Sequence, residues 1–149
     1  MIETTVEAKF NRSVEEVFAY VSRMENLGVW GAGIASCEQI HGSDAGPKAP
    51  GVGAVYRCTI GPSVPVLGMT GDYRIIAFEA NRSMVCRLDS PMLSFEDTYT
   101  FEERDGGTLL RIRDQLTPPF FLALASGMLA PVIRRQLEQD CRNLERELA

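Results

Sequence analysis

Polar and apolar residues alternate from the start of the chain. Every second residue from Ile2 to Phe10 is apolar or small except Thr4, and the residues between them are glutamate, threonine or lysine. This period of two predicts a half-buried strand. Similar patterns, separated by turn residues, predict further strands over 33–41, 52–60, 66–78, 83–88, 93–102 and 108–116. The connections between these strands are short, and 104–107 (Arg-Asp-Gly-Gly) is typical of a tight hairpin, so we expect an antiparallel sheet.

Between the first and second strands the pattern becomes helical. Ser13 stands three residues before Glu16, which is the spacing of a capping box, and apolar residues follow at helical spacing. Ser22 and Glu25 repeat this spacing. The sequence therefore predicts a second short helix, which we expect Gly28 to end.

The helical period returns at Pro118 and continues to the end of the chain. The predicted helix buries one apolar stripe and has a charged opposite face in its second half. Gly127 and Pro131 interrupt the pattern. Because proline removes a backbone hydrogen bond and clashes with the preceding turn, we expect a kink or break near 127–131.

This order of elements predicts an α+β domain that spans residues 1–149. A curved, seven-stranded antiparallel sheet wraps around one long C-terminal helix, and two short helices lie between strands 1 and 2. A sheet that closes around a single helix encloses space that side chains need not fill. We therefore expect an internal cavity between sheet and helix.

Composition removes several classes of function. The net charge of -5 repels phosphate backbones, so no nucleic-acid partner is expected. A single histidine, His41, and four cysteines without CxxC spacing argue against a metal centre, and we expect no cofactor. The first residues lack a secretory signal, so we expect a cytoplasmic protein whose cysteines stay reduced.

Several segments together resemble the START and birch-pollen-allergen (SRPBCC) superfamily, and within it the polyketide cyclase/dehydrase and lipid-transport family. The similar segments are 13–21 (SVEEVFAYV), 24–27 (MENL) with Trp30, 51–56 (GVGAVY), 107–108 after 99–101, and the tail 134–148. The resemblance implies a helix-grip fold with an internal cavity for an apolar or amphipathic small molecule. It leaves the reaction open, because the family mixes carriers and cyclases on one scaffold.

Two acidic residues fall on strand faces that we expect to point inward. Asp97 shares a face with Phe95, Tyr99 and Phe101, and Asp114 follows apolar positions on the next strand. A buried carboxyl group needs a hydrogen-bond partner or has a raised pKa, as general acids and bases do. Asp97, Tyr99 and Asp114 are therefore candidate catalytic residues. Two alternatives remain: Asp97 lies in solvent near the end of its strand, or both acids are structural hydrogen-bonding groups.

Further residues are candidate ligand contacts because they combine apolar bodies with polar ends or lie on apolar stretches. They are Trp30, Arg57, Tyr73, Phe95, Phe101, Phe121, Leu124 and Met128. Core packing explains the tyrosines equally well. The resemblance favours Trp30 as a structural plug over a guard at the pocket mouth, and Arg57 and Tyr73 are also expected partners for the two acids.

The segment Thr117–Ile133 carries no charge, and it is too interrupted for a transmembrane helix. Core burial explains one face of it. For the other face we rank a ligand entrance first, a homodimer interface second and transient membrane contact third.

The leading hypothesis is a binding protein for a hydrophobic or amphipathic small molecule, lipid-like or polyketide-like, in the internal cavity. The first alternative is a cofactor-independent cyclase, aromatase or dehydratase that acts on a polyketide-like substrate by acid/base catalysis. The second is a protein-interaction module that uses the apolar C-terminal stretch.

Overall fold

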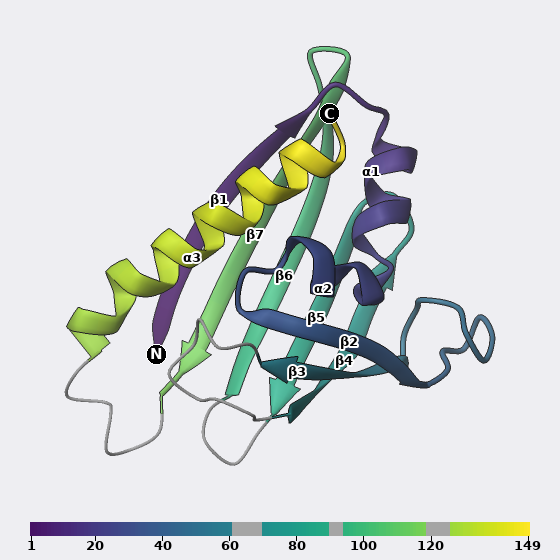
Figure 1. Cartoon of the computed structure of the whole chain (residues 1–149). Coiled ribbons are helices and arrows are strands. Elements are labelled where there is room, and N and C mark those ends of the chain that lie inside the picture. The colour runs from purple at the N-terminus through teal and green to yellow at the C-terminus, as the bar shows by residue number, and fades with distance from the viewer. Residues whose placement is uncertain (61–69, 90–93, 119–125) are drawn as a thin grey trace.

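The computed structural model describes residues 1–60, 70–89, 94–118 and 126–149 (Figure 1). Its elements, in chain order, are β1 (Ile2–Phe10), α1 (Val14–Val21), the 3-10 turn η1 (Met24–Asn26), α2 (Leu27–Trp30), β2 (Ile34–His41), β3 (Val55–Ile60), β4 (Thr70–Glu79), β5 (Ser83–Asp89), β6 (Ser94–Arg104), β7 (Gly107–Thr117) and α3 (Ser126–Glu147).

The strands form one antiparallel sheet of seven strands in the order β1-β7-β6-β5-β4-β3-β2. The sheet bends strongly, so that β2 and β3 run across the direction of β6 and β7 in Figure 1. The long helix α3 lies diagonally along β1 and reaches α2, while α1 and α2 lie over the other half of the sheet. This arrangement confirms the predicted α+β helix-grip fold.

Local sequence signals fix the helix pair and the last hairpin. Ser13 caps α1, because its hydroxyl accepts a hydrogen bond from the backbone N–H of Glu16 at 3.2 Å. At the β6–β7 turn, Asp105 and Gly106 have φ of 54° and 78°, the left-handed pair of a tight hairpin. The expectation for Gly28 is wrong: α2 continues to Trp30, and Ser22 ends α1 and caps no second helix.

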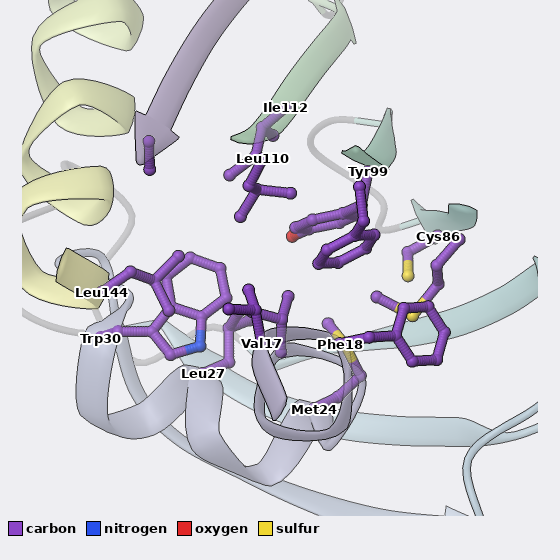
Figure 2. Packing of buried hydrophobic residues seen from close by; sticks show 14 of the residues in the cluster. Val17, Phe18, Met24, Leu27, Trp30, Cys86, Tyr99, Leu110, Ile112 and Leu144 are labelled. Carbon is purple, nitrogen blue, oxygen red and sulfur yellow. The ribbon is translucent and has the colours of Figure 1, made fainter. Parts of the chain in front are cut away.

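The core lies between the helix pair and the inner face of the sheet. Figure 2 shows Val17 and Leu27 from the helices facing Leu110 and Ile112 of β7. The ring of Phe18 packs edge to face against Phe78 and Phe101, at centroid separations of 5.2 and 5.0 Å. This half of the interior is therefore filled by side chains.

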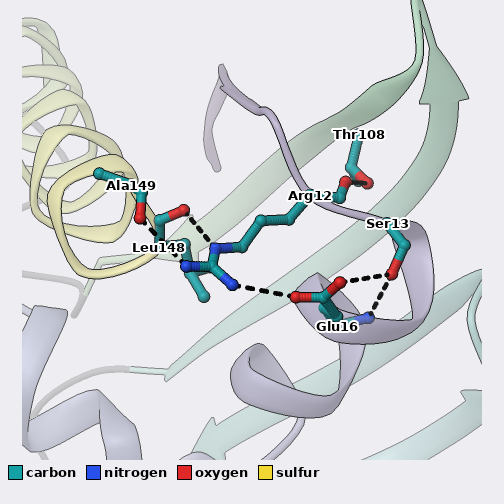
Figure 3. A network of polar contacts seen from close by, with 6 residues as sticks. All are labelled: Arg12, Ser13, Glu16, Thr108, Leu148 and Ala149. Atoms are coloured by element: carbon teal, nitrogen blue, oxygen red, sulfur yellow. Dashed lines mark hydrogen bonds and ion pairs between the residues drawn. The ribbon is translucent and has the colours of Figure 1, made fainter.

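Arg12 ties the C-terminal end of α3 to the β1–α1 connection (Figure 3). Its guanidinium donates to the carbonyl oxygens of Leu148 at 2.8 Å and Ala149 at 3.1 Å, and it pairs with Glu16 at 3.0 Å. These contacts hold one end of α3 in place over the sheet.

Between Ser126 and Glu147 α3 runs through Pro131 without interruption, so a break within these residues is wrong, while a kink stays a prediction. Pro131 removes one intrahelical hydrogen bond, the one to the carbonyl oxygen of Gly127, and the helix continues on both sides of it. The predicted onset at Pro118 is followed by residues outside the described part of the chain.

The expectation that all four cysteines stay reduced is also wrong. Cys37 on β2 and Cys58 on β3 form a disulfide, while Cys86 and Cys141 are free and buried. The two bonded residues lie opposite each other in the β2–β3 register, with their Cα atoms 4.1 Å apart. The pairing register of β2 and β3 cannot be determined from the sequence alone, so this cysteine pair could not be predicted. The cytoplasmic location stays a prediction.

Candidate ligand-binding site

A cavity of about 200 Å³ lies between the sheet, the α2–β2 connection and α3. Its apolar wall consists of Leu27, Trp30, Ile34, Phe95, Ile112, Leu116, Ile133 and Leu137. Its polar wall consists of Tyr73, Asp97, Tyr99, Asp114, Gln136 and Asp140, and Gly31 and Gly33 complete the lining. The strands contribute alternate residues to this wall because their side chains point to the two faces of the sheet in turn.

The α2–β2 connection is held over the cavity by two polar contacts with α3. The carboxylate of Asp140 accepts a hydrogen bond from the backbone N–H of Ala32 at 2.7 Å. The side-chain amide of Asn143 donates to the carbonyl oxygen of Trp30 at 3.0 Å. These contacts place the Trp30 indole in the wall, where it is 2% exposed.

Asp97 and Asp114 face each other across β6 and β7. They are directly paired in the strand register, and each is buried, at 6% and 7% exposure. The hydroxyl of Tyr73 donates a hydrogen bond to Oδ2 of Asp97. Within the described residues, Oδ1 of Asp97 and Nε1 of Trp30 are buried without a hydrogen-bond partner. The alternative in which Asp97 lies in solvent is therefore wrong.

Burial shifts the acids of this cavity toward their neutral forms. The pKa of Asp97 is raised well above its usual range, mainly by desolvation and further by the adjacent Asp114 carboxyl group. Desolvation also raises the pKa of Asp114. It raises the pKa of Asp140 to about 7. Two carboxyl groups this close do not both ionise readily, so the protonation of Asp97 depends on that of Asp114.

The structure brings most of the candidate residues to this cavity. Trp30, Tyr73, Phe95, Asp97, Tyr99 and Asp114 all line it. Three others lie elsewhere. Arg57 is on the outer face of β3 in an ion pair with Asp72 at 3.0 Å, Phe101 packs in the core, and Met128 is 79% exposed. Phe121 and Leu124 lie outside the described residues.

Sequence reasoning missed the contribution of α3 to the polar wall. Asp140 and Gln136 line the cavity from this helix, and neither was a candidate. A signal was present, because Asp140 stands three residues after Leu137 and four before Leu144 on the buried stripe. An acidic residue on a buried stripe needs a polar partner in the interior, and for Asp140 this partner is the backbone N–H of Ala32.

The described residues contain no group of three or more histidine, cysteine, aspartate or glutamate side chains placed to hold a metal ion. None of the helices in the described part of the chain is long and apolar enough to cross a membrane. The three interpretations of Thr117–Ile133 depend largely on 119–125, which are not described, and they stay predictions.

Solved structures with the same fold come from several sources. A START superfamily protein from Mycobacterium smegmatis has a TM-score of 0.81 at 14% identity, with 99% of this chain and 97% of that chain covered. A protein from Thermus thermophilus has a TM-score of 0.75 at 15% identity, with coverage of 98% and 96%. Ara h 8.0201 has a TM-score of 0.68 at 14% identity, again with 98% and 96% covered. No curated protein sequence matches the chain.

The curved sheet, the long helix across it and the cavity between them define a helix-grip protein of the START-like (SRPBCC) superfamily. The sequence specifies the family. The family described as polyketide cyclase / dehydrase and lipid transport matches residues 1–149, and the chain belongs to it. Proteins of this fold family bind hydrophobic ligands.

Proposed function

We propose that residues 1–149 form one binding domain for a small amphipathic molecule, held in the cavity between the sheet and α3. The observation that carries this proposal is the unpartnered Oδ1 of Asp97 in a cavity that has one apolar wall and one polar wall. Native proteins pair nearly all their buried polar atoms, so a bound polar group is the natural partner for this oxygen.

The cavity volume determines how large a part of a ligand the described residues can enclose. A protein cavity of about 150 Å³ is large enough for benzene. A cavity of about 200 Å³ therefore suits one ring with a short chain better than a long-chain lipid. Family membership supports an apolar ligand body, and the aspartates support a polar end.

Trp30 is the single tryptophan of the chain and lies in the cavity wall, so its fluorescence reports occupancy directly. We expect iodobenzene, an apolar probe that carries a heavy atom, to quench this fluorescence in a saturable way. Aqueous iodide should quench weakly, because Trp30 is 2% exposed. Native mass spectrometry of the purified protein gives a second reading through any retained small-molecule adduct.

Two neighbouring residues of α3 provide a matched pair of variants. Ile133→Phe adds volume inside the cavity wall and should abolish saturable quenching by iodobenzene. Val132→Phe makes the same kind of addition at a side chain that is 56% exposed and should leave quenching unchanged. Equal quenching in the two variants, or non-saturable quenching in the native protein, would contradict binding in this cavity.

A second candidate function is acid/base catalysis on a polyketide-like substrate. The observation that favours it is the buried pair Asp97 and Asp114, whose carboxyl groups have raised pKa values and lie beside the Tyr73 hydroxyl. Asp97→Asn and Asp114→Asn should then abolish turnover of a poly-ketone substrate without unfolding the protein. Unchanged rates in both variants would reject this role.

A further inference from the structure

The cavity wall contains acidic side chains and no basic one among its described residues. Asp97 on β6, Asp114 on β7 and Asp140 on α3 line it, and no lysine, arginine or histidine is among the described residues of the lining. The segments 61–69, 90–93 and 119–125 contain no charged residue in their sequence, so they bring no basic side chain wherever they lie. The three carboxyl groups thus have no cationic side chain as a partner in the wall.

The groups that interact with Asp97 are also all acidic or neutral. They come from every element around it: Tyr73 on β4, Cys86 on β5, Tyr99 on β6, Asp114 on β7 and Asp140 on α3. The Oδ1 atom of Asp97 is buried without a hydrogen-bond partner among the described residues. A buried acidic cluster with an unused acceptor atom is chemically matched to a cationic donor.

Aromatic rings surround the same space. Trp30, Tyr73, Phe95 and Tyr99 all line the cavity, and the rings of Tyr73 and Phe95 lie 5.8 Å apart. The faces of aromatic rings attract cations, and this attraction is strongest where water is excluded. Carboxylate groups and aromatic faces together are matched to an organic ammonium group. The Nε1–H of Trp30 in the same wall, unpartnered among the described residues, suits an acceptor atom elsewhere on the ligand.

We propose that the ligand carries a protonated primary amine on a body of about one ring, with the ammonium group held at Asp97, Asp114 and Asp140. A primary ammonium group has three N–H donors, and the three carboxyl groups supply acceptors from three different elements. This inference rests on the proposed binding function and names the ligand class for the same cavity.

Three ligands with the same phenyl ring and similar chain length test the polar end: 2-phenylethylamine, 2-phenylethanol and phenylacetate. Calorimetry with the native protein at about pH 7.5 should give an affinity for the amine at least about tenfold higher than for the alcohol, the effect expected of one charge-assisted hydrogen bond in a buried site. Phenylacetate should bind more weakly than either. An alcohol that binds as tightly as the amine would overturn the inference.

Two variants remove the same charge from different faces of α3. Asp140→Asn should lower the affinity for 2-phenylethylamine by about tenfold and change the affinity for 2-phenylethanol less than about twofold. Glu138→Gln, at an exposed residue outside the cavity lining, should leave both affinities unchanged. If the two variants weaken amine binding equally, the affinity depends on the net charge of the protein and not on a contact with Asp140. That result would contradict the inference.

Proton release on ligand binding tests the inference with the native protein alone. Because the carboxyl groups are held toward their neutral forms, binding of an ammonium group should displace protons to the buffer, whereas binding of the alcohol should not. Calorimetry in two buffers of different ionisation enthalpy measures this difference, and equal proton release for both ligands would contradict the inference.

The same titrations separate this inference from the proposed function. Saturable quenching by iodobenzene together with no binding of 2-phenylethylamine would overturn the amine inference and leave the cavity-binding function standing. Failure of iodobenzene and the three phenyl ligands alike would overturn both.

Discussion

Asp140 provides a direct test of the electrostatics of the cavity through the variant Asp140→Asn. The carboxyl group is 7% exposed and accepts a hydrogen bond from the N–H of Ala32 at 2.7 Å. Asparagine has nearly the same shape, and its amide oxygen can accept the same hydrogen bond. The substitution therefore removes the ionisation of this group while it keeps the contact that positions the α2–β2 connection.

The sign of the effect follows from the direction of the pKa shift. Burial raises the pKa of Asp140 in the folded protein from 3.8 to about 7. When the pH rises between these values, the unfolded chain loses this proton first, so the free energy of unfolding of the native sequence falls. At about 1.4 kcal/mol per pKa unit, the total loss is about 4 kcal/mol once the pH exceeds the folded-state value.

Urea unfolding of the native protein and of Asp140→Asn, from about pH 5 to about pH 8.5, measures this loss as a difference between the two proteins. Asp97 and Asp114 also have raised pKa values, but they are present in both proteins, so their contributions cancel to a first approximation. The variant should gain about 3 kcal/mol relative to the native sequence across this range. A difference that does not change with pH would show that Asp140 is well solvated, and one that falls with pH would show that a cation holds it ionised.

Three further predictions concern the fold. Gly107→Ala should lower the free energy of unfolding by about 1–3 kcal/mol in urea unfolding, because a Cβ atom there would overlap the backbone of β1; Gly127→Ala, where a Cβ atom meets no described residue beyond its own helix within 4 Å, is the control and should not destabilise. Reduction of the Cys37–Cys58 disulfide, which closes a loop with a sequence separation of 21, should lower stability by about 3 kcal/mol, and an unchanged urea midpoint after reduction would contradict this. Leu144→Ala, at a fully buried side chain on α3, should cost about 2–5 kcal/mol by the same assay, and a loss under about 1 kcal/mol would mean that α3 packs loosely.

Period and turn chemistry were sufficient to predict the fold. The alternation from Ile2 to Phe10 and the hairpin residues Asp105 and Gly106 gave the correct strands, because each signal is local. Strand boundaries were less accurate. The strand predicted from residue 52 begins at Val55, since Gly53 has a φ of 93° and the preceding loop continues through it.

The candidate site was predicted in part, for the same reason. Alternation along β6 places Asp97 and Tyr99 on the inner face, and both line the cavity. Alternation places Arg57 on the outer face, because its neighbours Tyr56 and Cys58 are the buried residues of β3, so the pattern argued against it as a ligand contact. Phe101 obeys the rule but lies beyond the cavity, where Phe18 of α1 fills the space against it. Alternation determines which face a residue occupies, and only the packed helices determine which part of that face is left unfilled.

Asp140 shows where sequence reasoning stops for this chain. Its position among the apolar residues of α3 indicates burial, but its hydrogen-bond partner, Ala32, lies 108 residues away in a connection with no pattern of its own. The three acidic residues on β6, β7 and α3 are also far apart in the sequence. No local motif therefore predicts that they form one cluster. In a helix-grip fold the long helix and the sheet come from separate parts of the sequence, so the polar groups that define ligand chemistry converge only after the sheet has curved around the helix. The ligand chemistry of this cavity therefore depends on acidic residues that only the folded chain brings together.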